Sequence, residues 1–258
     1  MGVARINGVR INYQVSGEGP PLLLIHGLGS SLQDWERQVP AFAQRYRVIA
    51  ADLRGYGASD RHGPFTIAQF VADQWALLER LGVERCRVLG YSMGGAVAMQ
   101  MALDRPERVE KLVLSNTLPS FRTDRFGKKL LMWTRLGMMA LLGPRRLSES
   151  VARKLFPRPD QAALRERVAR RRAGNDRGAY VSTVMALTRW SVAERVTELK
   201  MPVLILVAEH DYFPAEDAER FRTLLPGAGY RCFPGTRHAL PLEAPEDYNQ
   251  AVLQFLAD

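Results

Sequence analysis

Val88-Leu89-Gly90-Tyr91-Ser92-Met93-Gly94-Gly95-Ala96-Val97 joins a short apolar run to Gly-x-Ser-x-Gly and then to small residues at helical spacing. A serine presented on a sharp turn from a strand into a helix needs a strained backbone, and the residues around it pass close to one another. Glycine two positions before and two positions after Ser92 removes the side chains that would clash there. The stretch therefore predicts a nucleophile turn. The bare pattern also occurs by chance, so its surroundings have to support it.

Strands are predicted on both sides of this turn. Residues 3–6 and 9–15 form an opening hairpin joined at Asn7-Gly8, a strong turn dipeptide. Continuous apolar runs, typical of strands buried on both faces, then follow. The predicted strands of this kind are 22–25, 47–51, 87–89, 109–114, 202–208 and 230–233, with a loop over 234–238 after the last.

Helices are predicted between these strands. They cover 32–42, 67–81 with Thr66 as the cap and Gly82 as the stop, the segment from Ser92 to about Pro106, 215–224 and 245–256. Strands that alternate with helices indicate a mostly parallel central sheet with helices on both faces.

The alternation stops at residue 119 and resumes at residue 200. The intervening segment is helical and strand-poor, with helices predicted near 130–142, 161–172 and 180–187. We interpret residues 119–199 as an inserted helical cap, or lid, on a core domain made of residues 1–118 and 200–258. Its methionines and Trp133 are spaced for packing, and some of them could line a substrate pocket.

Charge is unevenly distributed along the chain. The formal net charge is +9, and residues 119–200 alone carry 19 Lys/Arg against 7 Asp/Glu. Two interpretations stay open: a solvated helical surface, or a docking surface for an acidic acyl-carrier protein or a coenzyme A thioester. No motif for nucleic-acid binding accompanies the charge, so a nucleic-acid partner is not expected.

Composition restricts the remaining possibilities. No apolar run approaches the length of a membrane span, and Met1 to Ile6 lacks the apolar core of a secretory signal, so a cytoplasmic location is expected. Cys86 and Cys232 fall in predicted strands and are expected to be buried thiols. The four histidines are scattered, and neither a metal nor an organic cofactor is expected.

Three reactive side chains follow the carboxyl ends of predicted strands, where parallel-sheet enzymes bind their ligands. They are Ser92, Asp211 and His238. A serine hydroxyl needs a base to remove its proton. His238 suits that role because His26 belongs to an early loop, and strand alternation points His210 away from the side to which Asp211 points. Asp211 would hold the His238 ring in the correct tautomer.

The chain resembles the α/β-hydrolase superfamily over nearly its full length. The motifs that carry the resemblance are His26-Gly27-Leu28-Gly29, Asp52-Leu53-Arg54-Gly55-Tyr56-Gly57-Ala58-Ser59, Gly90 to Gly95, Asp211 and Gly235-Thr236-Arg237-His238. The order serine, acid, histidine is that of the family's triad. The resemblance is greatest to the capped branch of esterases, enol-lactonases and carbon–carbon-bond hydrolases. It implies an α/β-hydrolase fold with a cap, and oxyanion donors at the backbone N–H groups of Leu28 and Met93.

A serine esterase acting on a small-molecule ester or lactone is the leading functional prediction. The alternatives are hydrolysis of a carbon–carbon bond or enol-lactone, an esterase, thioesterase or acyltransferase that acts on carrier- or coenzyme A-linked acyl groups, and a non-catalytic receptor or scaffold on the same fold. Haloalkane dehalogenases that resemble this chain use aspartate as the nucleophile, so Ser92 argues against that branch. The loop from Asp52 to Asp60 is expected to be structural, with Arg54 and Asp60 bracing it.

Overall fold

The computed structural model describes residues 1–123 and 126–257. Residues 124–125 of the predicted cap and Asp258 of the predicted core lie outside this range. One eight-stranded sheet has the order β1-β2-β4-β3-β5-β6-β7-β8. The strands are β1 (Gly2–Ile6), β2 (Val9–Ser16), β3 (Pro21–Ile25), β4 (Arg47–Ala51), β5 (Cys86–Tyr91), β6 (Val109–Ser115), β7 (Val203–His210) and β8 (Gly229–Arg237).

The sheet is mostly parallel, as predicted. β2 pairs antiparallel with β1 and β4, and the five remaining pairings are parallel. The α-helices are α1 (Val39–Phe42), α2 (Ile67–Arg80), α3 (Met93–Asp104), α4 (Phe126–Leu155), α5 (Ala162–Arg172), α6 (Arg177–Leu187), α7 (Ala215–Leu224), α8 (Leu240–Glu243) and α9 (Pro245–Ala257). Short 3-10 turns occupy Leu32–Trp35, Pro106–Arg108, Pro159–Gln161 and Val196–Glu198.

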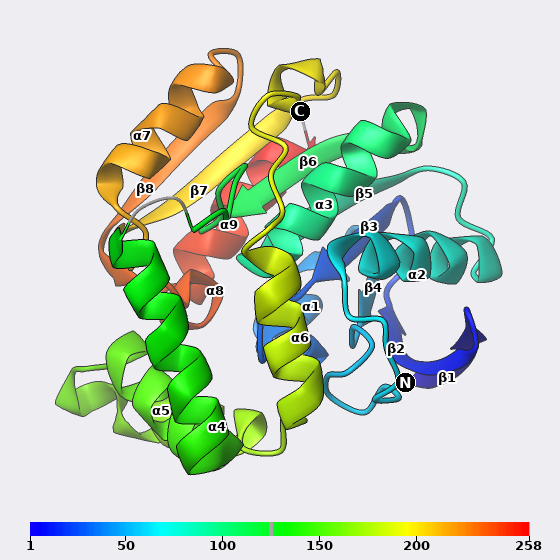
Figure 1. Cartoon of the computed structure of the whole chain (residues 1–258). Helices are drawn as coiled ribbons and strands as arrows, with labels where there is room; N and C mark the ends of the chain where they lie inside the picture. The colour runs from blue at the N-terminus through cyan, green and yellow to red at the C-terminus, as the bar shows by residue number, and fades with distance from the viewer. Residues whose placement is uncertain (124–125, 258) are drawn as a thin grey trace.

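Alternate residues of the central strands bury their side chains in two different cores. Leu23 and Ile25 of β3 pack with α2, α3 and Phe221 of α7 on one face of the sheet. Leu22 and Leu24 pack with α1 and α9 on the other face. Helices cover both faces of the sheet (Figure 1). Both faces of β3 are therefore buried, which is why its sequence is a continuous apolar run.

The segment between β6 and β7 holds α4, α5 and α6, which gather at one end of the sheet (Figure 1). α4 is broken by a kink at Gly143, which has a φ of 75° and is followed in the chain by Pro144. The predicted helix 130–142 ends at that kink, and the helical structure resumes and continues to Leu155. Leu136 and Met139 are buried, whereas Trp133 and Leu141 are exposed, so the predicted apolar stripe of this helix packs only in part.

Three expectations about local structure are wrong, and one short helix was missed. The helix expected over 32–42 is split, because residues 36–38 separate a 3-10 turn that ends at Trp35 from the four-residue α1, which has Pro40 in its first turn. The loop expected over 234–238 is largely the end of β8, which continues to Arg237 past a register shift. The helix α8 was not predicted. Cys232 is exposed, because β8 is an edge strand, whereas Cys86 is buried as expected.

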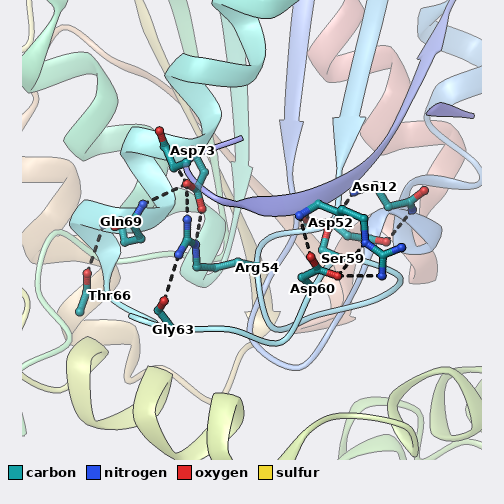
Figure 2. Close-up of polar contacts among 11 residues, drawn as sticks. Asn12, Asp52, Arg54, Ser59, Asp60, Gly63, Thr66, Gln69 and Asp73 are labelled. Atoms are coloured by element: carbon teal, nitrogen blue, oxygen red, sulfur yellow. Dashed lines mark hydrogen bonds and ion pairs between the residues drawn. The ribbon is translucent and has the colours of Figure 1, made fainter. Parts of the chain in front are cut away.

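The loop after β4 is held by two polar clusters, which Figure 2 shows. Arg54 pairs with Asp73 of α2 through Nε (2.6 Å) and Nη2 (2.7 Å), and both side chains are almost fully buried. Asp60 accepts hydrogen bonds from the backbone N–H and the Nε of Arg10. The bracing role predicted for Arg54 and Asp60 is confirmed.

Asp52 connects this loop to the loop after β3. Its Oδ1 accepts a hydrogen bond from the Leu32 N–H (2.7 Å), and its Oδ2 accepts one from Asn12 Nδ2 (2.7 Å). The Leu53 N–H donates to Nε2 of His26 (3.0 Å). These bonds fix the chain on both sides of Leu28.

No helix among residues 1–123 and 126–257 is long and apolar enough to cross a membrane.

Candidate active site

Ser92 lies at the turn between β5 and α3 with φ 56° and ψ −119°, a conformation that L-residues rarely adopt. The surrounding backbone holds it there. The Ser92 N–H donates to the Ser115 carbonyl (2.9 Å), and Thr117 Oγ1 donates to the Ser92 carbonyl (2.8 Å). The residues at and just after the end of β6 therefore hold Ser92 in its strained conformation through two hydrogen bonds.

Two glycines make this turn sterically possible. A Cβ on Gly90 would lie 2.3 Å from the Gly94 carbonyl oxygen, and a Cβ on Gly94 would lie 2.1 Å from the Ile25 carbonyl oxygen. Both obstacles are backbone atoms, which cannot rotate away. The Gly-x-Ser-x-Gly spacing thus lets the start of α3 pack directly against the end of β3.

His238 connects Ser92 with Asp211. Its Nε2 lies 2.9 Å from Ser92 Oγ, and its Nδ1 lies 2.8 Å from Asp211 Oδ1. With the proton on Nδ1, the ring donates to Asp211 and leaves Nε2 free to accept the serine proton. The three residues that sequence reasoning singled out therefore meet at one place, although they come from the ends of three different strands.

Asp211 is held as a carboxylate. Burial acts to raise its pKa, but the His238 ring, the Asn116 amide and the backbone N–H of Phe213 together lower the pKa below its usual value. Asn116 Nδ2 donates to Oδ2 (2.6 Å), and the Phe213 N–H donates to Oδ1 (3.1 Å). An ionised Asp211 can stabilise the imidazolium that forms when His238 takes a proton.

Aromatic rings enclose His238, which is only 2% exposed. The centroid of the Tyr212 ring lies 3.8 Å from that of His238, and the rings of Tyr91 and Phe213 lie 5.4 Å and 5.2 Å away. Burial lowers the pKa of His238, and the pKa-raising effect of Asp211 does not fully offset this. The ring is therefore neutral, and able to act as a base, at neutral pH. Tyr91 also lines the cavity beside Ser92 and His238.

Leu28 and Met93 flank Ser92. A Cβ on Gly27 would lie 3.2 Å from Ser92 Cβ, so the 27–28 backbone passes directly beside the serine. Met93 is the first residue of α3, where a backbone N–H has no partner within the helix. Neither N–H donates a hydrogen bond among the residues that the structure describes. Their role as oxyanion donors stays a prediction.

A cavity of about 150 Å³ opens above Ser92 and His238. A cavity of roughly this volume holds a benzene-sized group. Its walls combine the loop after β3, the segment after β6, the helices α4 to α6 and the loop after β7. Apolar lining residues include Leu28, Leu118, Phe121, Met132, Val184 and Leu187, and two arginines, Arg135 and Arg172, also line the cavity.

His210, the histidine next to Asp211 in the sequence, lies outside the site. His210 is exposed beside Glu209, 3.7 Å away, and it is not among the residues that line the cavity. Sequence reasoning missed Asn116 and Thr117, which hold Asp211 and Ser92, and it missed the two cavity arginines. Asn116 and Thr117 follow directly after a predicted strand, so their position could have identified them as site residues.

In the described parts of the chain, no cluster of three or more His, Cys, Asp or Glu residues has a geometry suited to a metal ion.

Many basic residues of the 119–199 segment are paired. Arg171 and Arg167 contact Glu36 of the core, Arg172 contacts Asp34, and Arg170 pairs with Glu166 along α5. Much of the positive charge therefore ties α5 to the core or is balanced locally. Docking of an acidic carrier protein or a coenzyme A thioester to this segment stays a prediction.

The fold and the site define a hydrolase of the α/β class. Residues 20–245 match the alpha/beta hydrolase fold family, and the chain belongs to that family. A putative carbamate hydrolase, RutD, from Caulobacter sp. (strain K31) is 31% identical over 247 residues, which cover 92% of this chain and 90% of the relative. A fluoroacetate dehalogenase from Burkholderia sp. is 37% identical over 131 residues; these cover 47% of this chain and 43% of the dehalogenase.

Solved structures agree on the fold. The bromoperoxidase from Bacillus anthracis superposes with a TM-score of 0.92 at 25% identity, covering 100% of this chain and 99% of that one. The enol-lactonase from Burkholderia xenovorans LB400 superposes over the whole of both chains with a TM-score of 0.91 at 24% identity. At this low identity the enol-lactonase establishes a common fold and no common substrate.

Proposed function

We propose that the protein is a serine hydrolase that cleaves a carboxylic ester or lactone through an acyl-enzyme on Ser92. The observation that carries the proposal is the hydrogen-bonded chain from Ser92 Oγ through His238 to Asp211, at 2.9 Å and 2.8 Å. Both distances suit direct proton transfer or orientation without rearrangement.

In this mechanism His238 Nε2 takes the proton of Ser92 Oγ as the oxygen attacks the substrate carbonyl. The backbone N–H groups of Leu28 and Met93 would stabilise the negative oxygen of the tetrahedral intermediate. The protonated His238 then gives its proton to the departing alcohol, leaving the acyl group on Ser92. Water, deprotonated by the same ring, releases the acid and restores the serine.

The segment 119–199 acts in this proposal as a cap. Its helices supply Met132, Val184 and Leu187 to the cavity wall, opposite Ser92 and His238 on the core. An apolar wall above the nucleophile would exclude bulk water from the acyl-enzyme and select the substrate by shape.

Carbamate hydrolysis is a second candidate, because a relative that matches nearly the full length of this chain is described as a putative carbamate hydrolase. Carbamates, enol-lactones and vinylogous diketones all present a carbonyl carbon that the same serine could attack. A fluoroacetate dehalogenase also matches part of the chain. Ser92 argues against carbon–halogen cleavage, because the related dehalogenases use aspartate as their nucleophile.

The test is hydrolysis of short-chain nitrophenyl esters alongside a carbamate, an enol-lactone and a vinylogous diketone. The wild type should turn over at least the simple esters, and Ser92→Ala should abolish turnover and labelling by a fluorophosphonate probe. Ser182→Ala, at an exposed serine on α6, is the matched control. Equal activity in Ser92→Ala would contradict the nucleophile assignment, and an unlabelled wild type would favour a non-catalytic role.

A further inference from the structure

Two arginines reach a cavity whose walls are otherwise mainly apolar. Arg135 lies in the first half of α4, and Arg172 is the last residue of α5. Guanidinium groups are seldom placed in an apolar pocket without a counterion, because an unpaired charge loses its hydration there. Their presence calls for an explanation that general ester hydrolysis does not supply.

Arg172 is held in place but is not saturated. It is 8% exposed, and its Nη2 donates to Asp34 Oδ2 at 2.9 Å. Asp34 is itself fixed by the Ser30 hydroxyl. The Nε of Arg172 is buried and has no hydrogen-bond partner among the described residues. Buried donors without a partner are rare in folded proteins, so the bond to Asp34 leaves part of the hydrogen-bonding capacity of Arg172 unused.

Arg135 has an aromatic partner instead of an acidic one. Its guanidinium carbon lies 5.0 Å from the centroid of the Tyr212 ring, which in turn stacks on His238. No carboxylate pairs with Arg135 in the part of the chain that the structure describes. The carboxylate of Asp211 is already bound by His238, Asn116 and the Phe213 N–H. Arg135 therefore has no counterion among these residues.

We propose that Arg135 and Arg172 form an anion subsite and that the substrate is an ester or lactone carrying a free carboxylate. This inference rests on the proposed function, since it names the substrate class of the same cavity. A planar carboxylate matches the fork of N–H donors on a guanidinium group. Both arginines line the cavity that contains Ser92 and His238, so a small substrate could place its carbonyl on Ser92 and its carboxylate on the arginines.

The test compares esters that differ only in the charge at the far end of the acyl chain. Monomethyl glutarate and methyl pentanoate have the same reacting group and a five-carbon acyl chain, so the ratio of their kcat/KM values isolates the carboxylate. The wild type should favour monomethyl glutarate by about tenfold or more, the size expected from charge-assisted hydrogen bonds. Arg135→Met should reduce that ratio by about tenfold.

Arg170→Met is the matched control, because Arg170 is exposed on α5 and pairs with Glu166 outside the cavity. It should leave the ratio unchanged. Arg172→Lys keeps a cation for Asp34 while removing the Nε donor and the planar fork, and it should also lower the ratio. Acetoxyacetate and ethyl acetate repeat the comparison with the carboxylate on the alcohol side.

Calorimetric titration with glutarate tests the subsite independently of catalysis. The wild type and Arg170→Met should bind glutarate, and Arg135→Met should bind it about tenfold more weakly. Ser92-dependent turnover of neutral esters, with no preference for either charged ester and no glutarate binding, would overturn the subsite and leave the proposed function standing. Glutarate binding that depends on Arg135, without turnover of any ester, would support the subsite and overturn the proposed function.

Discussion

Asn116 Nδ2 donates a 2.6 Å hydrogen bond to Asp211 Oδ2, the carboxylate oxygen that does not face His238. Asn116 follows β6, and Asp211 follows β7, so adjacent parallel strands bring the two together. The bond lowers the pKa of Asp211 and fixes the direction in which its other oxygen points. Asn116 therefore positions the residue that positions the proposed base.

Asn116→Leu should lower kcat by about tenfold or more, because a hydrogen bond to a charged group is lost from a buried site. The KM should change little, since Asn116 does not line the cavity. Steady-state kinetics on an ester that the wild type hydrolyses will measure both parameters. Asn116→Asp should be worse still, because two carboxylates would face each other. Wild-type kcat in both variants would exclude the positioning role.

Gly90→Ala should destabilise the fold by about 1–3 kcal/mol or more, because the new methyl group would overlap the Gly94 backbone. Urea unfolding followed by circular dichroism gives the free energy of unfolding. Gly137→Ala is the matched control. It lies inside α4 with no atom near the added methyl group, and it should stabilise the helix by about 0.5–1 kcal/mol. Equal stability of the two variants would contradict the steric account of the turn.

The core fold and the Ser92–His238–Asp211 arrangement could be anticipated because both depend on local patterns. Buried parallel strands read as apolar runs, and glycine is needed where backbones approach each other, so β3, β5 and the serine turn leave direct traces in the sequence. His238 could be chosen over His210 because strand alternation separates the directions of neighbouring side chains.

The cavity could not be anticipated in the same way. Arg135 and Arg172 lie in a segment with many arginines, and nothing in their local sequence distinguishes them from the exposed Arg170. Their place in the cavity depends on the kink at Gly143 and on how α5 packs against the core, which are tertiary relationships. The exposure of Cys232 likewise follows from the edge position of β8, which a strand pattern alone does not specify.

The kcat/KM of the wild type should fall on the acid side with an apparent pKa below 6.5. Burial lowers the pKa of His238, so the ring stays neutral, and competent as a base, to a lower pH than a free histidine. Arg135 also acts to lower this pKa, so Arg135→Met should move the acid limb toward higher pH. A pH profile of an uncharged ester measures both effects. An acid limb above pH 6.5 in the wild type would contradict the buried, neutral base.

Native protein should expose one thiol to a reagent such as Ellman's, and unfolded protein two. Cys232 is exposed on β8, whereas Cys86 is fully buried and burial raises its pKa to about 12, so it carries almost no thiolate at pH 8. Cys232→Ser should eliminate labelling of the native protein without changing the count for Cys86 after unfolding. Rapid labelling of both thiols in the native wild type would contradict the burial of β5.

Asp73→Ala should destabilise the protein by about 3–5 kcal/mol, because it leaves the guanidinium of Arg54 buried without its counterion. Arg54 retains only the Gly63 carbonyl (3.3 Å) among the partners that the structure gives it. Glu198→Ala is the control: it breaks a half-exposed pair with Arg195 and should cost no more than about 1 kcal/mol.

Replacing both partners, as Arg54→Met with Asp73→Leu, should recover part of the loss, because no buried charge then stands alone. Urea unfolding of the wild type, Arg54→Met, Asp73→Leu and their double variant completes a double-mutant cycle. Since the loop from Asp52 to Asp60 also holds the chain around Leu28, the single variants should lose activity as well as stability. Stability losses that simply add across the cycle would show that the two buried charges do not depend on each other.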